Sequence, residues 1–290
     1  MTRIITSLSE ISESYDALFC DLWGCVHDGL APFAEAVAAL QAFRARGGTV
    51  MLVTNAPRAH APVRRQLDRL GVPSDAYDGI ATSGDSARAA MLRGAVGEKV
   101  YFIGQPHDQD FFAPLELIEN PVKISQVPLE QAEGMVCCGP FDPLADPEEM
   151  RAQFLQAKTR GLKLLCANPD IVVDRGETRE WCAGALAKLY TEMGGESLYF
   201  GKPHPPIYDL ARRRLQALGK DIPDSRILCV GDGILTDIDG AMGEDLDSLF
   251  ITGGLAARET QTADQPDPKA LMAYLTREMR QPTYSIGKLR

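Results

Sequence analysis

Short apolar runs alternate along the chain with longer segments whose apolar residues recur at helical spacing. Residues 17–20 (ALFC) are fully apolar, and residues 33–48 carry apolar side chains every three or four positions before two glycines. Residues 49–53 (TVMLV) are apolar again, and residues 58–71 are amphipathic and end at a glycine. Because strands that alternate with helices are typical of crossover connections, this order predicts a parallel α/β sheet.

The same alternation returns near the C-terminal end. Residues 226–230 (RILCV) and 248–252 (SLFIT) predict two more strands. Residues 236–242 predict the start of a helix, and residues 267–280 predict a closing helix. The first and last parts of the chain are therefore expected to share one sheet.

The middle of the chain has elements of its own. We expect strands at residues 99–103, 134–138 and 162–166, and a helix at residues 147–161 with acidic residues in its first turn and basic ones in its last. We predict a doubly wound, Rossmann-like core with an inserted α/β cap domain. The expected boundaries are 1–84 and 194–290 for the core, and 85–193 for the cap.

Composition excludes some classes of protein. The chain is 45% hydrophobic and 24% charged, as in an ordinary globular protein, and its net charge of −10 contains no clustered basic run. Nucleic-acid binding is therefore disfavoured, whereas a small anionic substrate is still compatible with a local positive site or a metal ion.

Membrane association and secretion are also disfavoured. The first residues lack an apolar signal core, and no apolar run is long enough to span a bilayer. The seven cysteines have no paired C-x-x-C spacing, and five of them lie in apolar strand-like runs. We expect buried free thiols in a cytoplasmic protein that has no membrane partner.

Polar side chains follow several of the expected strands or lie in a loop near them. Ligands of open parallel sheets bind beyond the carboxyl ends of the strands, so we expect these residues to converge. They are Asp21, Thr54, Asn55, Lys202, Asp232 and Asp237.

The residue types in this set suit phosphoryl transfer. Asp21 is a candidate nucleophile or metal ligand, and Thr54 and Asn55 are candidate donors to phosphate oxygens. Lys202 supplies positive charge to the same anion or to the attacking carboxylate. Asp232 and Asp237 are hard oxygen ligands of the kind that Mg²⁺ prefers.

The motifs resemble those of the haloacid dehalogenase (HAD) superfamily, in order: DLWGCVHDG, VTNAPR, FGKPHPPIY and GDGILTD. The place of the insertion, the segment ATSGDSARAAM and the segments CANPDIVVDRG and EWCAGALAKLYTEMGG resemble the subclass IIA, or NagD-like, capped phosphatases. The D-x-W-G-x-x-x-D-G pattern of the first motif resembles one subgroup of that class.

This resemblance implies a role for each matching residue. Asp21 would attack phosphorus and form an aspartyl phosphate, while Thr54 and Lys202 would hold the phosphate and Asn55 would order its loop. Mg²⁺ would be bound by Asp21, by Asp232, by the main-chain carbonyl of residue 23, and by Asp237 as a ligand or as a partner of the ligands. The resemblance also implies a small phosphorylated metabolite as substrate and a possible homodimer.

Trp23 departs from the family pattern. Family phosphatases carry an aspartate there, which protonates the leaving group and then activates water. An indole can do neither, because it does not titrate near neutral pH. Loss of a general acid–base costs about 10²–10⁴-fold in rate.

Three functions therefore stay open. The first is a phosphatase of a sugar phosphate, phosphoglycolate or nucleoside monophosphate, with His27 or Asp28 as a substitute acid–base. The second is a catalytically impaired phosphate-ligand-binding or regulatory protein. The third is a 2-haloacid dehalogenase, against which the magnesium-type carboxylates Asp232 and Asp237 argue.

The cap is expected to choose the substrate. Its polar and aromatic candidates for substrate contact are Asn168, Asp170, Arg175, Arg179 and Trp181. Arg175 and Arg179 would share one face if their segment were helical, and Trp181 could stack on a sugar or base.

Overall fold

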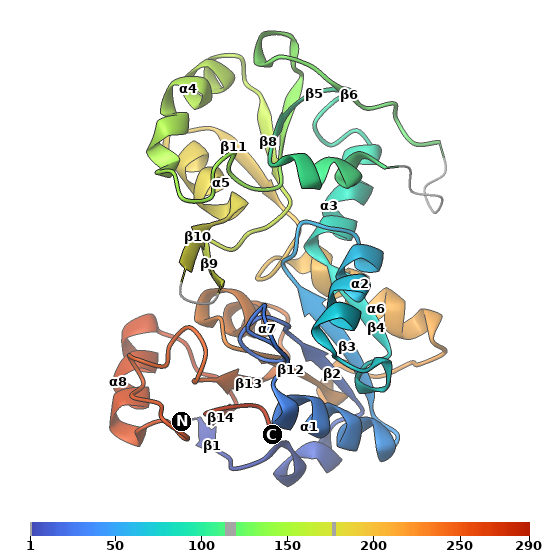
Figure 1. The fold of residues 1–290 in the computed structure, drawn as a ribbon, viewed down its shortest axis with the longest axis vertical. Coiled ribbons are helices and arrows are strands. Elements are labelled where there is room, and N and C mark those ends of the chain that lie inside the picture. The colour runs from blue at the N-terminus through green and yellow to red at the C-terminus, as the bar shows by residue number, and fades with distance from the viewer. Residues whose placement is uncertain (1, 114–119, 176–177) are drawn as a thin grey trace. The chain divides into compact units, whose positions relative to one another are not determined.

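The computed structural model describes residues 2–113, 120–175 and 178–290 (Figure 1). Contacts divide the chain into two compact units. The first contains Met1–Thr54, Arg64–Ala81 and Lys202–Arg290, and the second contains Asn55–Val63 and Thr82–Gly201. Each unit is therefore formed from segments that are not contiguous in the sequence.

The first unit is built on a seven-stranded sheet with the order β1-β14-β13-β12-β2-β3-β4. The pairs from β1 through to β3 are parallel, which confirms the predicted sheet type. The strands are β1 (Arg3–Ile4), β2 (Ala17–Cys20), β3 (Thr49–Thr54), β4 (Gly79–Thr82), β12 (Ile227–Gly231), β13 (Asp247–Ile251) and β14 (Tyr284–Ile286).

Helices connect and cover these strands. They are α1 (Ala34–Ala45), α2 (His60–Leu70), α6 (Pro205–Ala217), α7 (Asp239–Gly243) and α8 (Pro268–Glu278). Ile207 and Tyr208 of α6 pack on Phe19, Met51 and Cys229 of the central strands, so this helix covers one face of the sheet. The helix expected from residue 236 begins as a π-helical turn, Ile234–Ile238, and continues as α7.

The second unit has its own sheet, with the order β11-β8-β7-β5-β6 and parallel pairing throughout. An antiparallel hairpin of two further strands accompanies it. The strands are β5 (Lys99–Ile103), β6 (Ser125–Gln126), β7 (Gly134–Cys137), β8 (Lys163–Cys166), β9 (Val172–Arg175), β10 (Thr178–Trp181) and β11 (Glu196–Tyr199).

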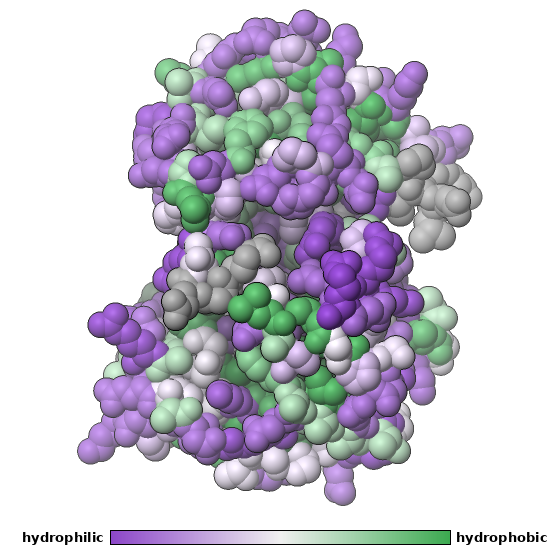
Figure 2. Space-filling view, in the orientation of Figure 1, coloured by the Kyte–Doolittle hydropathy of each residue, from purple (hydrophilic) through white to green (hydrophobic). Residues whose placement is uncertain are grey.

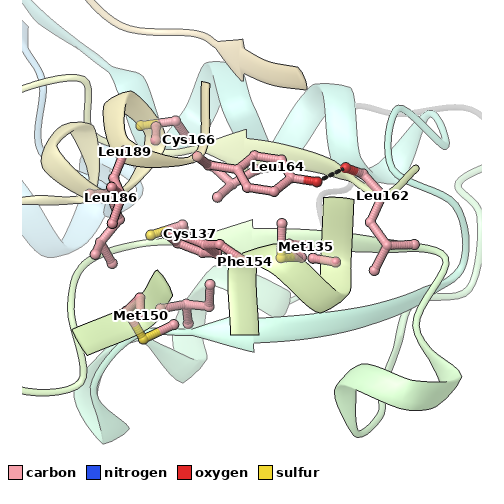
Figure 3. Packing of buried hydrophobic residues seen from close by; sticks show 14 of the residues in the cluster. Met135, Cys137, Met150, Phe154, Leu162, Leu164, Cys166, Leu186 and Leu189 are labelled. Carbon is pink, nitrogen blue, oxygen red and sulfur yellow. Dashed lines mark hydrogen bonds between the residues drawn. The ribbon is translucent and has the colours of Figure 1, made fainter. Parts of the chain in front are cut away.

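Two apolar layers enclose the second sheet. Alternate residues of a strand face opposite sides, so Met135 and Val136 of β7 belong to different clusters. The cluster of Met135 includes residues of α4 (Arg151–Thr159) and α5 (Ala183–Glu192), and Tyr190 donates a hydrogen bond to the carbonyl of Leu162 (Figure 3). The cluster of Val136 includes residues of α3 (Ser83–Leu92).

Short 3₁₀ segments supplement these elements, at Leu8–Glu10, Ser12–Ser14, Ser74–Ala76, Pro106–Phe112, Leu129–Gln131, Pro147–Met150 and Asp224–Arg226. The helix expected at residues 147–161 is therefore 3₁₀ in its first turn and α-helical from Arg151.

The contact boundaries differ from the expected 84/85 and 193/194. The second unit also takes in Asn55–Val63, because this segment bonds to the start of α3. It extends to Gly201 because β11 pairs with β8 of the second sheet. The hydrophobic pattern of the sequence could not predict these boundaries, because they depend on a few hydrogen bonds and on one short strand pair.

The surface and the cysteine positions can be compared with what composition predicted about membranes and free thiols. Figure 2 shows a mainly hydrophilic visible face with smaller apolar patches on both units. Within the described ranges, no helix has the length and apolarity needed to cross a membrane. All seven cysteines are buried and free, which confirms the prediction of buried thiols.

Candidate active site

The order of the central strands brings three sequence motifs to one edge of the first sheet. Cys20 at the end of β2 is in register with Leu52 of β3 on one side and with Val230 of β12 on the other. Asp21, Thr54 and Asp232 follow these three positions by one or two residues. Because the strands are parallel, the residues share the carboxyl edge where ligands of such sheets bind.

Lys202 lies between two carboxylates of this edge. Its Nζ is 2.7 Å from Oδ1 of Asp21 and 2.6 Å from Oδ1 of Asp237, and all three side chains are buried. Buried charges need partners, since an isolated one costs several kcal/mol to desolvate. The ammonium group therefore balances at most one of the two negative charges.

Asp232 adds a third carboxylate to this buried cluster. Burial raises its pKa well above the ordinary value, and the charges of Asp21 and Asp237 add to this rise. Burial also raises the pKa of Asp237 to about 6, although Lys202 acts in the opposite direction. Three buried carboxylates with one lysine form a site that a further cation would stabilise.

A divalent metal fits this chemistry. Asp21, Cys25 and Asp232 each offer a ligand atom, and in the described part of the chain these atoms lie within 4.8 Å of one another. Mg²⁺ takes oxygen rather than thiol ligands, so Cys25 is the least suited of the three, and burial raises the pKa of its thiol well above the usual value. Two carboxylates remain, which is the number that Mg²⁺ typically uses together with waters and substrate phosphate.

Asp237 lies outside this group of three. Its Oδ1 accepts a hydrogen bond from Lys202, and its Oδ2 accepts one from the main-chain N–H of Gly233 at 3.1 Å. These bonds occupy both oxygens and favour a role in holding the lysine.

Close backbone packing fixes the Asp232 carboxylate. A Cβ atom at Gly24 would lie 2.2 Å from its Oδ2, and one at Gly254 would lie 2.0 Å from the same atom. The N–H of Leu255 donates to that oxygen at 3.0 Å. Sequence reasoning missed Cys25, Gly24 and Gly254 as site residues, although the glycine pair after residue 252 was a visible signal.

Trp23 packs within its own turn. Its ring contacts that of His27 edge to face, with centroids 5.0 Å apart, and a Cβ at Gly29 would lie 2.3 Å from the indole. His27 is 1% exposed, and its Nδ1 accepts a hydrogen bond from the N–H of Gly29 at 3.0 Å. In the neutral imidazole the proton therefore lies on Nε2.

Asp28 is exposed and is used locally. Its Oδ1 accepts the N–H groups of Leu30 at 2.9 Å and Ala31 at 2.8 Å, and these bonds lower the pKa of its carboxyl. A carboxyl group with a lowered pKa is a weaker proton donor, so these bonds disfavour Asp28 as a substitute acid.

The cap candidates all lie in the second unit. Asn168 is buried and accepts the N–H of Asp170 at 3.1 Å, while Asp170 accepts the side-chain amide of Asn55 at 2.8 Å. Trp181, at the end of β10, is 36% exposed.

The helical arrangement considered for the two cap arginines is wrong. Arg175 lies on β9 and Arg179 on β10, which pair as an antiparallel hairpin. The side chain of Arg175 lies outside the described part of the structure.

Comparison with known proteins identifies the family of the chain. A family model described as haloacid dehalogenase-like hydrolase matches residues 18–117, and a second, HAD-hydrolase-like model matches residues 199–277. A solved haloacid dehalogenase-like hydrolase from Brucella suis is 39% identical with a TM-score of 0.86, and the match covers 99% of this chain and 100% of that one.

Two curated relatives are more distant. A 5'-nucleotidase, YutF, from Bacillus subtilis is 25% identical over 91% of this chain and 97% of its own length. A D-glycerol 3-phosphate phosphatase from Mycobacterium tuberculosis is 29% identical over 86% of this chain and 66% of its own length. The mycobacterial glycerol phosphate phosphatase, solved in complex with magnesium, superposes with a TM-score of 0.66 at 25% identity over 99% of this chain and 78% of that one.

The Brucella hydrolase is similar to this chain over the full length of both, and the two family models match the segments that carry the predicted motifs. The chain therefore belongs to the haloacid dehalogenase-like hydrolase family, as its motifs predicted.

Proposed function

We propose that the protein is a Mg²⁺-dependent phosphatase that cleaves a small phosphomonoester through an aspartyl-phosphate intermediate. The observation that carries this proposal is the position of Lys202 between Asp21 and Asp237, beside the buried carboxylate of Asp232. A nucleophile, a phosphate-neutralising cation and a carboxylate pair for metal then lie at one sheet edge.

The relatives support the class of substrate. One is a 5'-nucleotidase and another is a glycerol 3-phosphate phosphatase, and the latter has been solved with magnesium. A sugar phosphate, phosphoglycolate or nucleoside monophosphate fits the same chemistry, because the reacting group is the phosphate ester that all of them share.

The reaction proceeds in two steps. A carboxylate oxygen of Asp21 attacks phosphorus, and the bond to the leaving oxygen breaks with its electron pair, so this oxygen takes up a proton. Water then attacks the acyl phosphate, gives up a proton, and restores the carboxylate of Asp21 with release of inorganic phosphate. Lys202 and Thr54 hold the phosphate, and Asn55 orders the loop that follows Thr54.

Mg²⁺ would be held by Asp21 and Asp232, with the main-chain carbonyl of Trp23 as a further ligand. When bound, the ion supplies positive charge that offsets the repulsion between the carboxylates and the phosphate.

Trp23 removes the usual proton donor of the first step. The proton must come from water or from a substitute such as His27, since hydrogen bonds to Ala31 and Leu30 lower the pKa of Asp28. Trp23 also favours a second candidate function, a phosphate-ligand-binding protein with little turnover.

We also propose a cytoplasmic location, which the seven buried free thiols support because cysteines stay reduced there. A homodimer is a further expectation of the family resemblance.

A panel of phosphomonoesters tests the proposal. We expect hydrolysis of at least one with Mg²⁺ and its loss after chelation with EDTA, with recovery when Mg²⁺ is added back. Turnover that EDTA does not change, or release of halide from a 2-haloacid, would refute a metal-dependent phosphatase. Binding of inorganic phosphate with no turnover of any ester would support the second candidate.

A further inference from the structure

Two of the four peptide bonds at which the chain changes units adjoin the proposed phosphate ligands, and these two are called the crossings below. Thr54 is the last residue of the first unit before Asn55, and Lys202 is the first residue of that unit after Gly201. Asn55 and Gly201 belong to the second unit. Because Asn55 is bonded to Thr54 and Gly201 is bonded to Lys202, contacts that hold Asn55 and Gly201 also restrain the main chain of Thr54 and Lys202.

Asn55 is anchored by a side chain of the second unit. Its Nδ2 donates to Oδ1 of Asp170 at 2.8 Å, and Asn55 is 2% exposed. The main chain of Asp170 is itself held, since its N–H donates to Oδ1 of Asn168 at 3.1 Å and its carbonyl accepts the N–H of Gly184 at 3.1 Å. Two hydrogen bonds therefore hold the main chain of the acceptor residue, Asp170.

Gly201 packs against the same amide. A Cβ atom at Gly201 would lie 2.4 Å from Oδ1 of Asn55 and 2.7 Å from both Oγ of Ser83 and Cδ of Pro169. An added side chain would have to displace the Asn55 amide or its neighbours, so Gly201 packs directly against this amide. The two crossings therefore meet around the side chain of Asn55.

The residues after Asn55 are bound to α3. The carbonyl of Ala56 accepts the N–H of Gly84 at 3.0 Å, and Oδ2 of Asp85 lies 3.2 Å from the N–H of His60 and 2.9 Å from its Nδ1. These bonds hold the segment downstream of Asn55, and the bond to Asp170 holds the Asn55 side chain itself.

We propose that Asp170 is a positioning residue that holds Asn55, and through Asn55 and Gly201 fixes the two crossings that carry Thr54 and Lys202. This role differs from the substrate contact that the sequence suggested for Asp170. It rests on the proposed function, in which Thr54 and Lys202 bind the phosphate.

The two roles of Asp170 predict different patterns of loss. A positioning residue acts on the phosphate site, which every substrate shares, so its removal weakens all substrates by a similar factor. A residue that contacts the leaving group affects some substrates and spares others. A displacement of about 1 Å in a reacting group can cost on the order of 10²-fold in rate.

The test compares Asp170→Ala, which removes the acceptor, with Asp170→Asn, which retains a carbonyl oxygen for the Asn55 amide. Glu149→Ala is the matched control, since it deletes an exposed carboxylate of the same unit. We would measure kcat/KM for glycerol phosphate, a nucleoside monophosphate and 4-nitrophenyl phosphate, and the inhibition constant of inorganic phosphate.

For Asp170→Ala we expect kcat/KM to fall by about 10–100-fold with all three esters, and phosphate to inhibit more weakly by a comparable factor. Asp170→Asn should recover most of the loss, and Glu149→Ala should match the parent protein. Unchanged phosphate inhibition, or a loss confined to one ester, would overturn the proposal.

A pair of exchanges covers the case in which Asp170→Ala does not fold. Asn55→Asp alone places two carboxylates beside each other, which repel. In the double variant, Asn55→Asp with Asp170→Asn, the amide at position 170 donates to the carboxylate at position 55. We expect phosphate affinity to fall in the first and to recover in the second, and no recovery would contradict the proposal. Calorimetric phosphate binding gives the same readout if the parent protein hydrolyses none of the esters, so failure of the proposed function is distinguishable from failure of this inference.

Discussion

The carboxylate–lysine cluster and the turn from Trp23 to Gly29 lie in the same unit but differ in chemistry. The cluster is buried and charged, with Lys202 in contact with Asp21 and Asp237. In the turn, the side chains that the sequence offers for proton transfer are engaged locally: His27 packs on Trp23 and Asp28 binds main-chain N–H groups. The cluster therefore has the groups that would hold a phosphate, whereas the turn is the region from which a proton would have to come.

In the proposed function, the first region would supply phosphate binding and nucleophilic attack, while the second carries Trp23 where the family resemblance implies a proton-transferring carboxylate. This division predicts an enzyme whose first step depends strongly on the leaving group. An ester whose leaving oxygen needs no proton should react well, and an alkyl ester should react slowly.

Asp21→Asn should have the largest effect in the charged region. An amide is a poor nucleophile, so we expect kcat to fall on the order of 10⁴-fold or more while the protein still folds and binds phosphate. Steady-state kinetics and a phosphate titration measure the two properties. Activity close to that of the parent protein would exclude Asp21 as the nucleophile.

Lys202→Met should destabilise the same region. Removal of the lysine leaves two buried carboxylates without their cation, and breaking a buried pair in this way costs about 3–5 kcal/mol. Lys188→Ala is a suitable control, because its pair with Glu192 is exposed and such pairs contribute about 0–1 kcal/mol. Equal denaturation midpoints for the two variants would show that the Lys202 contacts do not stabilise the fold.

Gly29→Ala should have a smaller effect and should act on the turn. Gly29 has a φ of +87°, and an added Cβ would meet the indole of Trp23. Gly71→Ala is the control, since it has a φ of +84° with nothing within 4 Å of the added atom. Each should lose about 1–3 kcal/mol through backbone strain, and Gly29→Ala alone should also change the fluorescence of Trp23 and the catalytic rate. Identical behaviour of the two variants would mean that the indole contact has no consequence.

The sequence predicted the central strands because they are buried on both faces and read as continuous apolar runs, as at residues 17–20 and 49–53. It did not predict the edge strands β1 and β4 or the strand β14 beside β1, which are two to four residues long and carry too few side chains for a recognisable period. The cap hairpin β9–β10 was missed because its residues are mostly polar, and Arg175 and Arg179 were spaced as in a helix.

Asp21 and Asp232 were predictable because each follows a strand of one parallel sheet, whose carboxyl ends lie at one edge. Lys202 and Asp237 lie in a loop and in a helical turn, so their prediction depended on the motif resemblance. The contact of Asn55 with Asp170 was not predictable, since it joins residues 115 positions apart that belong to different motifs. The packing of Gly24 and Gly254 on Asp232 was hidden for the same reason, because a glycine in the sequence does not say what approaches it.

The separation of phosphate binding from proton transfer can be measured through the leaving-group dependence of Trp23→Asp. The substitution returns a carboxylate to the turn, and the measured quantity is the ratio of kcat/KM for the variant to that for the parent protein. We predict a ratio near one for 4-nitrophenyl phosphate, whose leaving group needs no proton, and an increase of about 10²-fold or more for glycerol phosphate. Equal ratios for the two esters would contradict the separation of phosphate binding from proton transfer.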